Sequence, residues 1–230
     1  MTRIILIETS TALCSAALAE NGRIISYKES SEPRSHASRT APFIKEILDA
    51  NGLSVKDCDA VCVSMGPGSY TGLRVGVSTA KGLCFGSGLP LLAVGTLDIL
   101  AAQAADEGRL PEGCKYIVPM IDARRMEVYT ALYGPDGQRL SEIRPEIVGN
   151  GSFAEQLSQG PVLFIGDGAE KCRETLAHEN AFFAQCCPTA AAMLRPATAE
   201  YEAKRFKDIA YFEPFYLKQF IATVSGKKLF

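Results

Sequence analysis

The chain has few of the residues and patterns that several functional classes require. It contains only two histidines, His36 and His178, and neither lies at metal-ligand spacing, so we do not expect a zinc site. Its eight cysteines include no C-x-x-C pair, and those within apolar runs are typical of small buried hydrophobic residues. No secretory leader is evident, because the first three residues lead directly into a short strand. We therefore expect a cytoplasmic protein with reduced thiols.

Charge and hydropathy argue against two further classes of partner. The net charge is -2 and the pI is near 5.8, whereas tight binding of nucleic acid by this chain alone would need a basic surface. The run over residues 82–97 carries no charge, and extended to residue 105 it would be a membrane candidate with Asp98 as its only charge. Three glycines and a proline interrupt it, however. It is better explained as a helix end, a turn, a buried strand Leu91–Val94 and a new helix with Thr96 as its N-cap. We expect no membrane association.

A glycine-rich loop over residues 64–76 is the most informative segment. It lies between an apolar run and an amphipathic run, the order expected for strand, loop and helix. Backbone N–H groups in such a loop, backed by a helix dipole, suit an anion, although the spacing matches neither Walker A nor the dinucleotide fingerprint. The alternative is that the glycines serve only the close packing of helix on strand. The candidate anion- or nucleotide-binding residues here are Gly66, Gly68, Ser69, Thr71 and Gly72.

The chain also contains an internal repeat. Two segments at a near-constant offset each predict a β-meander with tight turns. In the second copy an apolar run at 162–165 is followed by Gly-Asp-Gly and a predicted helix over 169–176. Strands followed by alternating helices and strands indicate an α/β fold of mixed sheets covered by helices. The predicted meander strands are 4–8, 14–19 and 23–25 in the first copy, and 116–122, 128–133 and 138–140 in the second.

The loop segment GPGSYTGLRVGVSTAKGL resembles the signature of the TsaB (YeaZ) family, bacterial partner subunits of the machinery that makes threonylcarbamoyladenosine in tRNA. The segments ILIETSTALCSAAL, IDARRMEVY and PFYLK agree in order and spacing over nearly the whole chain. The resemblance implies a duplicated actin-like (ribonuclease H-like) ATPase-superfamily fold. We expect one subdomain over residues 1–104, joined by the C-terminal segment 212–230, and a second over residues 105–211.

In that superfamily the acidic end of the first strand and the turn after it hold phosphate and metal. The resemblance places Glu8, Thr9 and Ser10 at this position as further candidate nucleotide-binding residues. The usual Asp and Gly are both missing, and a serine in place of glycine hinders a close approach of the backbone to phosphate. The alternative is that Glu8 and its neighbours simply close a β-turn.

The residues offer no evident catalytic centre. The related TsaD subunit carries a His-x-x-x-His pair, and the order of elements puts Thr96 and Leu100 at those two positions. Leucine cannot bind a metal, and threonine alone is a poor ligand. No hydroxyl in the glycine loop has a histidine partner that the sequence reveals. We therefore expect no metal and no catalytic residue.

The turn after the second copy's first strand carries both acids and arginines. Asp122 and Glu127 are candidates for a carboxylate pair across this turn. Arg124 and Arg125 lie between them, and they favour a salt-bridged turn instead.

Two predicted helices, Ser35–Ala50 and Leu73–Phe85, are candidates for a partner surface. The second is apolar on one side and rich in small residues on others, so it suits packing against two neighbours. In the TsaB family these helices pair with TsaD or with another TsaB. The alternative is that both faces are buried within the domain. The predicted interface residues are Ile44, Ile47, Arg74, Gly76, Val77 and Ala80.

The resemblance therefore implies a scaffold or dimerisation subunit. It would pair with a TsaD-type catalytic subunit, be joined by a TsaE-type ATPase, contact tRNA only through the complex, and form a homodimer when alone. We expect no tightly bound cofactor, with an adenine nucleotide at the subunit interface as the open alternative. The competing hypothesis is a stand-alone nucleotide hydrolase or glycoprotease-like enzyme. The missing histidine pair and the altered first turn favour the scaffold.

Overall fold

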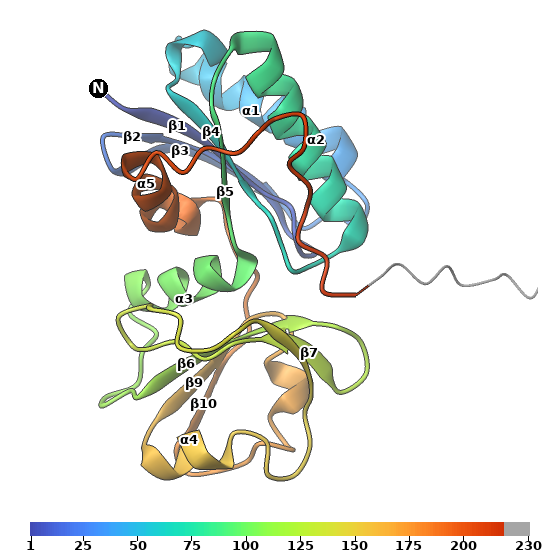
Figure 1. Ribbon diagram of the computed structural model, residues 1–230, viewed down its shortest axis with the longest axis vertical. Helices are drawn as coiled ribbons and strands as arrows, with labels where there is room; N and C mark the ends of the chain where they lie inside the picture. The colour runs from blue at the N-terminus through green and yellow to red at the C-terminus, as the bar shows by residue number, and fades with distance from the viewer. Residues whose placement is uncertain (219–230) are drawn as a thin grey trace, which may run out of the picture.

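Two five-stranded mixed sheets, one in each half of the molecule, form the fold in the computed structural model, which describes residues 1–218 (Figure 1). The strand orders are β3-β2-β1-β4-β5 and β8-β7-β6-β9-β10. In each sheet the first strand pairs antiparallel with the second and parallel with the fourth. The two copies therefore share one topology, and the duplicated α/β fold of mixed sheets predicted from the repeat is confirmed.

The elements of the first copy come in the order meander, helix, strand, helix, strand, helix. They are β1 Arg3–Glu8, β2 Cys14–Glu20, β3 Arg23–Ser30, α1 His36–Ala50, the 3₁₀ turn η1 Val55–Asp57, β4 Ala60–Ser64, α2 Tyr70–Ser87, β5 Leu91–Val94 and α3 Thr96–Asp106. The remaining elements are β6 Tyr116–Asp122, β7 Glu127–Thr130, β8 Arg144–Ile147, α4 Ala154–Gln159, β9 Val162–Ile165, η2 Glu170–Cys172, β10 Ala181–Ala184, η3 Ala191–Met193 and α5 Leu194–Glu202.

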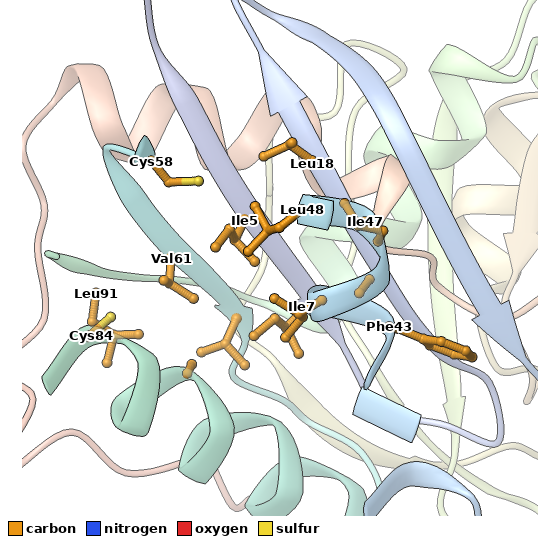
Figure 2. Packing of buried hydrophobic residues seen from close by; sticks show 14 of the residues in the cluster. Ile5, Ile7, Leu18, Phe43, Ile47, Leu48, Cys58, Val61, Cys84 and Leu91 are labelled. Carbon is orange, nitrogen blue, oxygen red and sulfur yellow. The ribbon is translucent and has the colours of Figure 1, made fainter. Parts of the chain in front are cut away.

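The central strands are apolar throughout because both faces of the first sheet are covered. Side chains alternate along β1, so Ile5 and Ile7 point to the side of α1 and α2, whereas Ile4 and Leu6 point to the opposite side. Figure 2 shows the first of these cores, where Ile47 and its neighbours on α1 meet the strand residues.

Helix α3 lies between the two sheets (Figure 1). Leu97 and Leu100 pack against the second sheet, and Ile99 packs in the core of the first. The helix begins one residue earlier than predicted, because Gly95 is its N-cap and Thr96 is its first residue. The backbone N–H of Thr96 donates instead to the carbonyl oxygen of Gly66 at 3.0 Å, which ties the start of α3 to the glycine loop.

The chain returns to the first sheet well before residue 212. Ala190, Met193 and Ala197 belong to the core of the first sheet, beside β1 and β5. Further on, the backbone of Lys207 bonds to Leu91. Residues 190–211 were assigned to the second subdomain from the sequence, and the structure corrects that boundary.

Two further predictions for the second copy need correction. Residues 138–140 form only an isolated bridge, through Arg139, and the edge strand is β8. The predicted helix over 169–176 is a 3₁₀ turn followed by irregular turns. Ala169, Cys172 and Leu176 are buried at helical spacing, but the backbone bonds between them mix i+3 and i+4 partners, so no regular helix forms.

Candidate functional site

The turn after β1 is buried. Glu8, Thr9 and Ser10 have no solvent exposure. Oxygen Oε1 of Glu8 accepts the backbone N–H of Ser10 at 2.5 Å, and Oε2 makes no hydrogen bond of standard geometry within residues 1–218. Burial raises the pKa of Glu8 to about 7, against the opposing effect of its hydrogen bonds with Ser10. The Glu8 carboxyl group thus already accepts the Ser10 N–H, a backbone donor that a bound phosphate would need.

The glycine loop packs directly on this turn. A β-carbon at Gly68 would lie 2.3 Å from the carbonyl oxygen of Ser10, and one at Gly72 would lie 2.0 Å from that of Thr9. Real Cβ contacts are never that short, so only glycine allows α2 to approach β1 here. Close packing, the alternative stated above, is sufficient to explain both glycines.

The polar groups of the loop are also largely engaged. The backbone N–H of Ser69 donates to the carbonyl oxygen of Ser10 at 2.6 Å. The Ser69 hydroxyl accepts the N–H of Gly72 at 3.3 Å and so caps α2. Gly66 has a φ of 107°, and Thr71 is exposed on the first turn of the helix. An anion would have to displace the Ser69 bond, and binding of an anion or nucleotide at this loop stays a prediction.

The two positions that would carry the TsaD-type histidine pair are both buried. Leu100 packs in the core between α3 and the second sheet, and Thr96 is the first residue of the helix. Asp98 between them accepts the hydroxyl of Tyr133 at 2.7 Å. Among residues 1–218, no three His, Cys, Asp or Glu side chains lie together so as to hold a metal ion. That the chain binds no metal stays a prediction.

The residues predicted for the partner surface lie on the wrong side of their helices. Four of the six are in the chain's own core: Ile44, Ile47, Val77 and Ala80. A β-carbon at Gly76 would lie 2.2 Å from Thr9 Oγ1, so this glycine also faces inward. Only Arg74 is exposed. The apolar stripe of each helix is buried against the first sheet. Ser78 and Gly82 on the other side of α2 are exposed, so the alternative that both faces are buried within the domain is only half right.

The outer side of α2 has features that the chain's own packing does not explain. A β-carbon at Gly82 or Gly86 would meet no described atom within 4 Å. Glycine inside a helix costs roughly 0.5–1 kcal/mol relative to alanine, so these two are unfavourable for the isolated chain. Phe85 between them is 87% exposed. Sequence reasoning missed Phe85 and Gly86, although two glycines four residues apart around an aromatic residue were a visible signal.

A C-terminal segment, which we call the strap (residues 206–216), borders this surface and runs beside α2 (Figure 1). The Lys81 ammonium on α2 donates to two strap carbonyl oxygens, each at 3.2 Å. The rings of Tyr70 and Tyr216 lie 4.9 Å apart, and the Arg74 guanidinium lies 4.0 Å from the centre of the Tyr70 ring. These contacts hold the strap against α2 and enclose a shallow hollow of about 260 Å³.

In the turn between β6 and β7, lysines neutralise the two carboxylates. Lys171 pairs with Asp122 and also donates to the backbone carbonyl of Glu127 at 2.7 Å, and Lys218 pairs with the Glu127 carboxylate. The prediction that the two arginines of this turn form its salt bridges is therefore wrong. Both lysines come from segments distant in sequence, which local pattern does not reveal.

Comparison with known proteins decides the family. The family model described as TsaD, tRNA N6-adenosine threonylcarbamoyltransferase, matches residues 28–219. The tRNA threonylcarbamoyladenosine biosynthesis protein TsaB of Escherichia coli (strain K12) is 32% identical, with 99% of this chain and 98% of the relative aligned. The chain belongs to the TsaB family. A TsaB of Bacillus subtilis (strain 168) is 34% identical over 71% of this chain and 70% of its own length.

Solved structures agree with membership of the TsaB family. A Pseudomonas aeruginosa protein described as similar to peptidase YEAZ superposes with a TM-score of 0.83 at 28% identity, covering 95% of this chain and all of that one. YeaZ from the same organism gives a TM-score of 0.78 at 27% identity, covering 94% of this chain and all of that one. The resemblance seen in the sequence is confirmed. In the part of this TsaB chain that the structure describes, no helix has the length and apolarity needed to span a bilayer.

Proposed function

We propose that the chain is the non-catalytic partner subunit of an assembly that transfers threonylcarbamoyl to the adenosine beside the tRNA anticodon. It pairs with a TsaD-type catalytic subunit through the outer faces of α1 and α2, and a TsaE-type ATPase joins the pair in the cytoplasm. The names of its relatives support the pathway. The exposed Gly82, Phe85 and Gly86 on α2 carry the argument for pairing.

The outer faces of the two helices fit a docking helix. α1 and α2 lie side by side on one face of the first sheet (Figure 1). Ala37, Ala41 and Pro42 are exposed on α1, so both helices present small side chains with little charge at these points. Small residues let a second helix approach closely, and an exposed phenylalanine is an anchor that docking would bury. In the absence of the catalytic subunit, the same surface on two copies would form a homodimer.

Gly82→Arg should weaken pairing with the catalytic subunit at least tenfold, or about 1.4 kcal/mol. The isolated variant should stay folded, because arginine is a good helix former and the position is open. Titration of the purified variant against the catalytic subunit gives the affinity, and circular dichroism reports the fold. Gly76→Arg is unsuitable, because its side chain would clash with Thr9 and unfold the protein.

Two control variants complete this experiment. Ala199→Arg adds the same charge on an exposed position of α5, on the opposite side of the first sheet, and should leave pairing unchanged. Gly82→Ala should raise the free energy of unfolding of the isolated chain by about 0.5–1 kcal/mol. Full pairing by a folded Gly82→Arg variant would place the interface elsewhere.

The isolated chain should neither hydrolyse ATP nor modify tRNA. Glu8 is fully buried, and its carboxyl group already occupies the N–H of Ser10, so neither group is available to a nucleotide. Phosphate release is measured on protein freed of contaminating ATPases. Steady turnover that disappears in Glu8→Ala would contradict this proposal and favour the hydrolase hypothesis. Titration of the assembled complex with ADP separately tests for nucleotide at the subunit interface.

A further inference from the structure

The turn between β6 and β7 holds two arginines in a strained backbone conformation. Arg124 has a φ of 72° and Arg125 a φ of 49°, so consecutive non-glycine residues are left-handed. Glycine or asparagine would occupy these positions with less strain. The conformation is held by the Asp122 carboxylate, which accepts the Arg124 N–H at 2.8 Å, and by the Glu127 N–H, which donates to the Arg124 carbonyl oxygen at 3.1 Å. Both arginine side chains are exposed.

Neither arginine has an ionic partner within residues 1–218. The flanking carboxylates of Asp122 and Glu127 are instead paired with Lys171 and Lys218. The Asp167 carboxylate also contacts this turn, accepting the backbone N–H of Asp122 at 2.9 Å. Four basic and three acidic side chains therefore meet here, which leaves a net charge of +1 on a chain whose total is -2. Arginines that served only to build the turn would be expected to use the adjacent carboxylates. The lysines take that role, and the guanidinium groups remain free for an external anion.

We propose that Arg124 and Arg125 contact the phosphate backbone of the tRNA when the complex binds its substrate. This inference rests on the proposed function. Arginine matches phosphate oxygens in geometry, and exposed arginines typically contact nucleic-acid backbones. A free nucleotide would require a concave site that buries its base, whereas these side chains lie on an exposed turn. Lys218, two residues past the strap, ties this turn to the segment that borders the α2 surface.

The test uses the full-length chain in complex with its catalytic subunit and an unmodified tRNA transcript. Arg124→Asn with Arg125→Asn removes both charges with a residue that tolerates the left-handed conformation. At near-physiological salt, tRNA affinity should fall about tenfold, and the slope of log affinity against log salt should fall by about 1.4–1.8, the value for two phosphate contacts. Fluorescence anisotropy at several salt concentrations gives both quantities.

A matched control has the same change of net charge elsewhere. Arg23→Gln with Lys56→Gln alters two exposed residues at the end of the first sheet opposite the glycine loop, and should leave affinity and slope unchanged. Thermal unfolding of the asparagine variant should occur at the same or a higher temperature than in the wild type, because strain is relieved.

The outcomes separate this inference from the proposed function. If the wild-type chain forms no complex, the proposed function fails. If the complex forms and the asparagine variant keeps its tRNA affinity and salt slope, the inference is overturned. It is also overturned if the variant loses affinity for ADP but not for tRNA, or if its unfolding temperature drops while the salt slope stays unchanged. The last result would assign the arginines a structural role.

Discussion

Gly72→Ala is expected to lower the free energy of unfolding by about 3 kcal/mol or more. Gly72 is the third residue of α2, where alanine is intrinsically favoured by about 1 kcal/mol. The added β-carbon would lie 2.0 Å from the carbonyl oxygen of Thr9 and 3.2 Å from its carbonyl carbon. These are backbone atoms of the turn after β1, so no side chain can rotate away, and either the helix or the turn must move. Urea unfolding monitored by circular dichroism measures the loss.

Gly82→Ala provides the matched comparison, because it makes the same change in the same helix at an open position. The two variants should change stability in opposite directions. If Gly72→Ala were as stable as the wild type, α2 would not approach the β1 turn as closely as described. The interpretation of the loop as a packing device would then be wrong.

Glu8 should make the protein less stable as the pH rises from about 4.5 to above 7. Burial raises its pKa from the ordinary value of 4.5 to about 7, so the folded state holds the proton more tightly than the unfolded state. The resulting stabilisation is fully present below pH 4.5 and is lost as the pH rises through 7. The difference corresponds to about 3 kcal/mol.

Glu8→Gln isolates this contribution, because glutamine resembles the protonated acid and does not titrate. The variant should be close to the wild type in stability at pH 4.5 and more stable by about 3 kcal/mol at pH 8. Comparing the two proteins at each pH cancels the effect of Asp167, whose pKa burial also raises, to about 6. A variant that is destabilised equally at both values would show that Glu8 is ionised and favourably bound in the folded state.

Local patterns predicted the buried strands well. The bounds of β5 and β9 match the predicted runs 91–94 and 162–165 residue for residue. Each is a short, continuous apolar run flanked by residues that end a strand. Neighbouring residues alone therefore indicate both the strand and its two ends. The common topology of the two sheets could also be predicted from the sequence, because the repeat places the same elements in the same order.

What the sequence did not reveal depends on contacts between distant residues. The N–H of Ala190 donates to the hydroxyl of Ser15 at 2.9 Å across 175 positions, and no local pattern indicates which sheet the segment at 190 joins. The helices pose a related problem. Periodicity identifies the apolar side of α2, but it does not say whether a partner or the chain's own sheet covers it. The choice of Val77 and Ala80 as interface residues failed for this reason.

The late return of the chain to the first sheet has a consequence for synthesis on the ribosome. All five strands of that sheet are complete once residue 94 has been made, yet the helix that covers one of its faces, α5, ends at residue 202. At roughly 5–20 residues per second, the interval is about 5–20 s. During this time Ile4, Leu6 and Leu92 cannot contact η3 and α5, and of the helices that cover them only α3, through Ile99, has been made. The N-terminal half is thus a nascent chain with an exposed apolar face, which holdase chaperones recognise, and it finishes folding only after the C-terminal half has emerged.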